Sequence, residues 1–191
     1  MITIKQLDKS AATRVGEIDR SEYVTLNYIY KDGKLEDKIV DWDVPRWHSG
    51  NGNHSISHMI DFSKRMLSTE GAVLLGALDG ESLAAIAIYR PNLTPTMAQL
   101  ALLHVSRAYR KQGIAKRLTD EMVKLAKADG ATEMYASATP SESAVGFYRS
   151  QGFEVAPPDR IQPELFKEEP EDIHMIKPLI DNIKPNGDKS T

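Results

Sequence analysis

The chain has 191 residues, 41% of them hydrophobic and 27% charged, which predicts one folded domain with an elaboration. Its 24 basic and 27 acidic residues give a net charge of −3, which argues against a dedicated nucleic-acid-binding protein. The absence of cysteine excludes disulfides, thiolate metal sites and a cysteine nucleophile. No apolar run approaches the roughly 18 residues of a membrane span, and the first residues lack the layout of a signal peptide. We therefore expect a soluble cytoplasmic protein that binds neither nucleic acid nor membranes.

Alternation and turn signals predict the elements of the first half of the chain. They are a strand over residues 1–7, a short helical stretch over 9–18, a hairpin over 23–42, a long loop over 43–53 and a helix over 54–68. Asp32-Gly33 is a hairpin-turn dipeptide. We expect this hairpin to be an extra amino-terminal element of a single domain spanning residues 1–180.

The second half of the chain alternates between strands and helices. Strands are predicted over 73–78, 83–89, 97–105, 132–138, 153–156 and 173–177, with a chain break at 91–95, a long helix over 113–128 and an acidic connection over 157–172. Thr139-Pro140-Ser141-Glu142 predicts a further helix, with Thr139 as its N-cap and Glu142 completing a capping box. Residues 181–191 are expected to be a frayed polar tail.

Positive charge is concentrated where the strand over 97–105 passes into the long helix. Five basic residues and no acid lie in this stretch: Arg107, Arg110, Lys111, Lys116 and Arg117. Unpaired N–H groups and the helix dipole make a helix N-terminus suitable for phosphate oxygens. The alternative interpretation is a solvated basic face with no ligand.

Two motifs in this half of the chain resemble one enzyme family. Arg110-Lys111-Gln112-Gly113-Ile114-Ala115 matches R-x-x-G-x-A, the acetyl-CoA pyrophosphate loop of the GNAT superfamily of N-acetyltransferases. Ala144-Val145-Gly146-Phe147-Tyr148 and the following residues to Phe153 are similar to the A-x-x-F-Y-x-x-x-G-F element of that family. The resemblance implies the α/β GNAT fold, a mixed central sheet flanked by helices, with its fourth and fifth strands splayed.

The resemblance also implies a set of residues that bind acetyl-CoA, the acyl donor. By this resemblance, the backbone N–H groups from Gln112 to Ala115 are expected to bind the pyrophosphate of acetyl-CoA. Backbone groups of Leu103 and Val105 are expected to hydrogen-bond to its pantetheine arm. The implied set comprises Leu103, Val105, Arg110, Lys111, Gln112, Gly113, Ile114, Ala115, Lys116 and Ser141. Ser141 stands where many relatives carry an asparagine that contacts pantetheine.

The resemblance assigns the catalytic acid to Tyr148, which would protonate the departing CoA thiolate. The alternative is that Tyr148 only packs against its aromatic neighbours. At the position where many relatives carry a carboxylate base this chain has Gln99, which cannot accept a proton. The base stays open between a water chain and an acid from the amino-terminal third.

Histidines provide no clear alternative site. His54 and His58 are four residues apart and would share a helix face, but no third ligand is suggested, so we expect no metal. His104 alternates with apolar neighbours and is expected to pack within the sheet.

The acceptor is expected to be a small cationic amine. Asp41-Trp42-Asp43 and Trp47-His48 combine carboxylates with indole faces, which suit a cation. Residues 18–21, Ile-Asp-x-Ser, are similar to antibiotic-acetylating members such as streptothricin acetyltransferases. We therefore predict an N-acetyltransferase acting on a primary amine by direct attack. A protein lysine or N-terminal acetyltransferase and a non-catalytic acyl-CoA-binding module are the alternatives, and a homodimer is left open.

Overall fold

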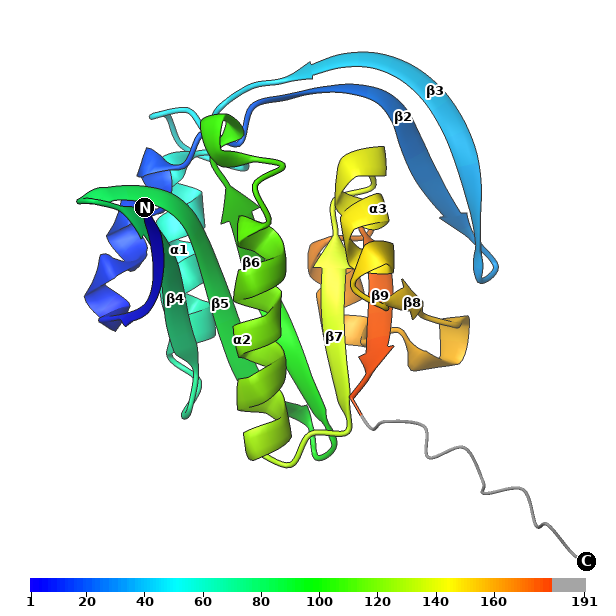
Figure 1. Cartoon of the computed structure of the whole chain (residues 1–191). Helices are drawn as coiled ribbons and strands as arrows, with labels where there is room; N and C mark the ends of the chain where they lie inside the picture. Colours follow the sequence, from blue (N-terminus) through cyan, green and yellow to red (C-terminus); the bar gives the residue numbers. More distant parts are fainter. Residues whose placement is uncertain (180–191) are drawn as a thin grey trace, which may run out of the picture.

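The computed structural model describes residues 1–179, in which a twisted sheet carries helices on both faces and a two-stranded arm curves over one end (Figure 1). The strands are β1 (Ile2–Leu7), β2 (Glu22–Lys31), β3 (Lys34–Val44), β4 (Val73–Asp79), β5 (Ser82–Thr94), β6 (Met97–Val105), β7 (Glu133–Ala138), β8 (Glu154–Val155) and β9 (Ile173–Pro178). The helices are η1 (Lys9–Glu17), α1 (Ile56–Leu67), η2 (Arg107–Tyr109), α2 (Ile114–Ala128), α3 (Glu142–Ser150), η3 (Pro158–Arg160) and α4 (Pro163–Glu168). The polar tail predicted over residues 181–191 lies outside the part of the chain that the structure describes.

The main sheet has seven strands in the order β1-β4-β5-β6-β7-β9-β8. All neighbouring pairs are antiparallel except β6 and β7, which are parallel and joined through α2. The long α2 connection is what a parallel pair requires. The mixed α/β sheet flanked by helices confirms the predicted fold class.

The sheet opens between β6 and β7. Their pairing ends at Leu100 and Ala136, although β6 continues beside β5 as far as Val105 and β7 continues to Ala138. A register shift in the β5–β6 ladder leaves Ala101 without a partner, and such bulges bend a strand. The carboxyl ends of β6 and β7 therefore splay apart, as predicted.

Two apolar layers hold the helices against the sheet. On one face α2 buries a stripe at helical spacing, formed by Ile114, Leu118, Met122 and Ala126. On the other face α1 and η1 cover a second cluster that includes Ile86, Ile88 and Leu102. The start of α2 is thereby fixed beside the open end of β6.

The arm formed by β2 and β3 is a separate two-stranded sheet, and it reaches across to α3 (Figure 1). The Tyr28 N–H donates to the Pro140 carbonyl at 2.7 Å, and the Tyr30 hydroxyl donates to the Ala156 carbonyl at 3.1 Å. Asn27 and Ser141 form an isolated bridge. The extra hairpin is thus docked beside the open end of the sheet.

The structure corrects three local predictions. β5 does not break at Pro91 but runs to Thr94, because an irregularity in its ladder accommodates the missing proline N–H. The N-cap of α3 is Ser141, not Thr139: Ser141 is extended and bridges to Asn27 of the arm, while Pro140 lies in a bend and its carbonyl accepts a hydrogen bond from Tyr28. The acidic connection contains α4, which the sequence pattern did not predict.

Among residues 1–179 no helix combines the length and the apolar character needed to cross a membrane.

Candidate active site

A loop with two left-handed residues leads into α2. Lys111 has φ +60° and Gly113 has φ +75°, and Gly113 is the N-cap. Within residues 1–179 the backbone N–H groups from Lys111 to Lys116 have no hydrogen-bond acceptor. Only open space lies within 4 Å of the place where a side chain at Gly113 would begin. Free N–H groups at the positive end of a 15-residue helix are an arrangement suited to phosphate oxygens, and we call this loop, residues 111–116, the cradle.

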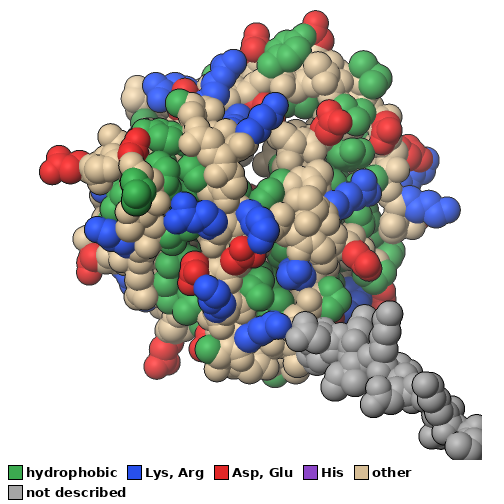
Figure 2. Space-filling model, viewed as in Figure 1, with side chains coloured by type: hydrophobic (Ala, Val, Ile, Leu, Met, Phe, Trp, Pro, Cys, Tyr) green, Lys and Arg blue, Asp and Glu red, His purple; other side chains and the backbone are tan. Residues whose placement is uncertain are grey.

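The basic side chains around this cradle have different surroundings. Arg107 and Lys111 are exposed, whereas Lys116 pairs with Asp120 at 2.8 Å. Figure 2 shows a hollow below the arm with Lys and Arg side chains at its rim. The cradle therefore faces solvent in a positively charged surrounding.

The side chain of Arg110 is engaged inside the protein. Its Nε donates to the Val105 carbonyl at 3.1 Å, and its terminal nitrogens donate to the carbonyls of Ser21 at 3.0 Å and Arg20 at 2.9 Å. The Arg107 N–H donates to the Asp19 carbonyl at 2.8 Å in the same region. Arg110 thus ties the end of β6 to the segment that enters the arm, and its guanidinium is occupied by these carbonyls.

The open edge of β6 carries the other predicted backbone contacts. Leu103 and Val105 are half-buried in the part of β6 that β7 does not pair with. His104 packs edge-on against the Trp47 ring at 4.9 Å between centroids, as expected. Burial, with the nearby Arg20 and Arg110, lowers the pKa of His104 to about 4, so the imidazole is neutral at pH 7.

Gln99 is buried on β6, where its amide oxygen accepts a hydrogen bond from Arg90 at 3.2 Å. The Gln99 amide is thus bonded to Arg90, and an amide cannot serve as the base of the reaction.

Tyr148 projects from α3 and is 7% exposed. Its ring packs against Phe147 and Phe153, with centroids 5.4 and 5.2 Å away. The hydroxyl has no hydrogen-bond partner in the part of the chain that the structure describes. Burial, with the carboxyls of Asp172 and Glu169, raises the pKa of Tyr148, so it holds its proton. The ring is packed while the hydroxyl remains available as a donor.

Ser141 is buried and caps α3. Its hydroxyl accepts a hydrogen bond from the Ala144 N–H at 3.3 Å and lies 3.2 Å from the Ser143 hydroxyl. The pantetheine contact implied for Ser141 would have to share this hydroxyl with the cap.

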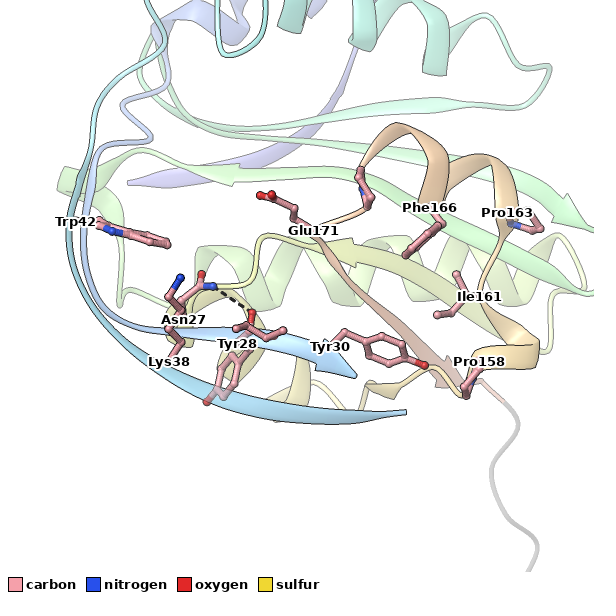
Figure 3. A pocket seen from close by; sticks show the side chains of 12 residues that line it. Asn27, Tyr28, Tyr30, Lys38, Trp42, Pro158, Ile161, Pro163, Phe166 and Glu171 are labelled. Carbon is pink, nitrogen blue, oxygen red and sulfur yellow. Dashed lines mark hydrogen bonds between the residues drawn. The ribbon is translucent and has the colours of Figure 1, made fainter. Parts of the chain in front are cut away.

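A cavity of about 710 Å³ lies between the arm and the segment that carries η3 and α4 (Figure 3). Its walls include the aromatic residues Tyr28, Tyr30, Trp42 and Phe166. Glu171 lines it from the loop before β9, and Lys38 lies 5.7 Å from the Trp42 ring centroid. The cavity combines aromatic faces with the carboxylate of Glu171 and the ammonium of Lys38, a lining that suits a partly apolar molecule with polar groups.

The predicted cluster at residues 41–48 is divided in the structure. Trp42 lines the cavity, but its neighbours Asp41 and Asp43 do not, because adjacent strand residues point to opposite faces. Asp41 instead accepts a hydrogen bond from Tyr23. Trp47 is buried against His104, away from Trp42. The carboxylate beside the aromatic walls is Glu171, from the acidic connection that precedes β9.

His54 and His58 do not share a helix face. His54 has φ +64° and precedes the Ser55 N-cap, so α1 begins only at Ile56. Among residues 1–179 no group of three or more His, Cys, Asp or Glu side chains gathers as a metal-ion site.

A mixed sheet that opens between two parallel strands, beside a phosphate cradle, defines the acetyltransferase class to which the motifs pointed. Residues 37–153 match the sequence model of the Acetyltransferase (GNAT) family. The match covers more than half of the chain, and the protein therefore belongs to this family of acetyltransferases. No curated protein matches the chain closely enough to count as a relative.

Solved structures share the fold at low sequence identity. Nourseothricin acetyltransferase is 14% identical with a TM-score of 0.69, over 94% of this chain and 99% of that one. A Bacillus anthracis protein assigned as a streptothricin acetyltransferase, solved with acetyl coenzyme A, is 16% identical (TM-score 0.59, 92% and 95% covered). The ribosomal-protein-S18-alanine N-acetyltransferase of Escherichia coli is 17% identical (TM-score 0.55, 100% and 99% covered). These likenesses show the fold.

Proposed function

We propose that this protein transfers the acetyl group of acetyl-CoA to the primary amine of a small cationic molecule. The observation that supports it most is the row of free N–H groups from Lys111 to Lys116 beside the opened strands β6 and β7. A phosphate-bearing donor fits the cradle, and an extended arm fits the open edge of a strand.

In this proposal the cradle holds the pyrophosphate of acetyl-CoA. The N–H groups of Gln112 to Ala115 donate to its oxygens, and Lys111 and Lys116 add positive charge at the rim. Gly113 is required because its left-handed backbone turns these N–H groups toward one point. Arg110 takes part through its backbone and by positioning the loop, since its side chain is already bonded to four backbone carbonyls.

The open end of β6 then receives the pantetheine arm. Backbone groups of Leu103 and Val105 pair with its amides and polarise the thioester carbonyl, a form of oxyanion stabilisation worth about 3 kcal/mol per well-placed donor. Ser141 supplies a further contact if its hydroxyl is shared with the helix cap. The Tyr148 hydroxyl gives its proton to the departing thiolate, for which its raised pKa keeps it protonated.

The cavity under the arm supports a small amine as the acceptor. Its aromatic walls can hold a cationic, partly apolar molecule, and Glu171 attracts the ammonium group. Two structural neighbours are named for acetylating antibiotics, and one for acetylating a ribosomal protein. The arm of residues 22–44 forms one wall of the cavity and narrows it, which favours a small molecule over a protein substrate.

An acceptor screen tests the proposal. Thiol release from acetyl-CoA is measured with polyamines, amino sugars, aminoglycosides, streptothricin and lysine peptides. We expect turnover with at least one small cationic amine and none with the peptides. Turnover with peptides alone would assign the protein-acetylating alternative, and acetyl-CoA binding without any turnover would assign a binding module.

Trp42→Ala locates the acceptor in the cavity. A cation–π contact is worth roughly 0.5–2 kcal/mol, so the acceptor KM should rise several-fold while acetyl-CoA affinity is unchanged. Ile39→Ala is the matched control, since Ile39 lies on the same strand, is 82% exposed and does not line the cavity. Equal KM values in the two variants would place the acceptor elsewhere.

A further inference from the structure

We propose that the acceptor is a monoamine with an elongated apolar body, and that Phe166 of α4 determines this preference. The assignment rests on the proposed amine acetylation and narrows its substrate class, since it selects against polyamines and other polycations. Charge and apolar surface are distributed unevenly within the cavity under the arm, and this distribution supports the assignment.

Both charged side chains that line the cavity lie toward the end that Trp42 lines (Figure 3). Lys38 lies 5.7 Å from the Trp42 ring centroid, and Glu171 lines the same end from the loop before β9. Neither side chain forms an ion pair within residues 1–179. Glu171 is therefore available to one ammonium group, whereas Lys38 repels a second one.

The charged end of the cavity adjoins the proposed donor site. Asn27, which lines this end, forms a bridge with Ser141 at the start of α3, and the neighbouring Tyr28 N–H donates to the Pro140 carbonyl at 2.7 Å. The proposed function places Ser141 beside the pantetheine arm. The reacting ammonium group of the acceptor thus belongs at the charged end, and the rest of the molecule extends along the cavity away from α3.

The other end of the cavity is apolar. It is lined by Tyr30, Pro158, Ile161, Pro163 and Phe166 (Figure 3). None of these side chains carries a charge at neutral pH, and the Tyr30 hydroxyl already donates to the Ala156 carbonyl at 3.1 Å. An alkyl or aryl body would bury apolar surface here, whereas a charged group would lose water without gaining a partner of opposite charge.

Several large apolar side chains of the lining are exposed to the cavity and to solvent. Ile29, Trp42 and Phe166 are 44%, 45% and 43% exposed. They are half of the six large hydrophobic side chains that are exposed among residues 1–179. Exposed apolar side chains that gather around one cavity are typical of surface that a ligand covers.

Phe166 is the member of this group placed to contact the acceptor body at the apolar end. Its ring packs against the ring of buried His174, with 5.7 Å between the centroids, and its N–H donates to the Gln162 carbonyl at 3.0 Å. Figure 3 shows its side chain reaching from α4 into the cavity. The ring is thus held by its neighbours while part of its surface remains free for a ligand.

Three amines of equal chain length test the assignment: hexylamine, hexamethylenediamine and ε-aminocaproate. They share the reacting amine and differ at the far end, which is a methyl, an ammonium or a carboxylate group. We expect kcat/KM to be highest for hexylamine, with either charged end lowering it about tenfold or more, because the apolar end offers no partner of opposite charge. From propylamine to hexylamine, each methylene that is buried should raise kcat/KM up to about fourfold.

Phe166→Asp places a carboxylate at the apolar end. It should lower kcat/KM for hexylamine and raise it for hexamethylenediamine, while acetyl-CoA affinity stays constant; damage to the fold would lower both amines together. Phe166→Leu keeps an apolar side chain and should keep the preference for hexylamine. Ile39→Asp is the matched control, since Ile39 is 82% exposed on the arm and does not line the cavity, and it should leave the ratio of the two amines unchanged.

The outcomes separate this assignment from the proposed function. A wild-type enzyme that prefers hexamethylenediamine or ε-aminocaproate, or that acetylates polyamines or aminoglycosides but not hexylamine, would overturn the assignment and leave the proposed function intact. A folded Phe166→Asp variant with the wild-type ratio would remove Phe166 as the determinant. An enzyme that acetylates none of these amines and no small amine of the acceptor screen would remove the proposed function and this assignment with it.

Discussion

The proposed donor site and the proposed acceptor site of this enzyme are built in opposite ways. The cradle is one contiguous loop whose working groups are backbone N–H groups, fixed by the left-handed residues Lys111 and Gly113. The acceptor cavity is assembled from side chains of three separate segments: the arm, the stretch after β8, and the loop before β9. A backbone site depends on few side chains, whereas the chemistry of the cavity changes with each residue that lines it.

Tyr148 is the proposed acid of the reaction, and Tyr148→Phe should have the largest effect. The change removes a hydroxyl that has no hydrogen-bond partner within residues 1–179 and keeps the ring contacts with Phe147 and Phe153. We expect kcat and kcat/KM to fall together by about 10²–10⁴-fold, the pattern of a lost transition-state interaction. Steady-state kinetics and calorimetry with acetyl-CoA measure the two effects.

Neither ligand should bind more weakly to this variant, because the cradle and the cavity are unchanged. Near wild-type turnover, under conditions where chemistry limits the rate, would make Tyr148 a packing residue. The thiolate would then take its proton from water.

Gly113→Val should damage the donor side alone. Valine at a positive φ is strained by roughly 1–2 kcal/mol, so the loop must turn its N–H groups away from the pyrophosphate. Losing one hydrogen bond to a charged group costs about 1.5 kcal/mol, which corresponds to about tenfold weaker acetyl-CoA binding. Calorimetry with acetyl-CoA measures this loss.

Gly130→Val is the matched control. Gly130 has φ +81°, has open space around it and lies at the other end of α2. Both variants should unfold at similarly reduced temperatures, but only Gly113→Val should lose affinity. Equal affinity losses would show that strain in α2, rather than the cradle, explains the effect.

The contrast between one contiguous loop and a cavity built from distant segments also explains which features the sequence could predict. The sheet, α2 and the cradle follow from local patterns, since a strand, a glycine and a helix stripe occupy consecutive residues. The side-chain bonds of Arg110 could not be predicted, because their partners Ser21 and Arg20 are about 90 residues away. Glu171 could not be singled out among the acids of its connection for a similar reason: its neighbour in space is the arm, and its neighbours in sequence are other acids.

The N-cap of α3 shows how tertiary contacts can displace a local signal. Thr139-Pro140-Ser141-Glu142 offers two hydroxyls for the cap, and the pattern alone favours Thr139. The arm decides between them, because its contacts with Pro140 and Ser141 keep these two residues outside the helix, with Ser141 extended as the N-cap. Sequence patterns thus predicted the family fold more closely than the contacts that adapt it.

Asp172→Asn should have the smallest effect, a change in how the stability of the protein depends on pH. A change in the cradle should not have this effect. Burial raises the pKa of Asp172 in the folded protein from 3.8 to about 8. Between these pH values the unfolded chain has released the proton while the folded protein still holds it, so raising the pH favours unfolding. The wild type should therefore lose stability as the pH rises from about 4 to 8, and the loss should level off above that range. Asparagine does not titrate, and most of this slope should disappear in the variant.

Urea unfolding at several pH values, in the absence of ligands, measures the slope. Lys111→Gln, a change in the exposed cradle, should keep the wild-type slope. An undiminished slope in Asp172→Asn would mean that other groups carry the pH dependence and that Asp172 ionises normally in the folded protein.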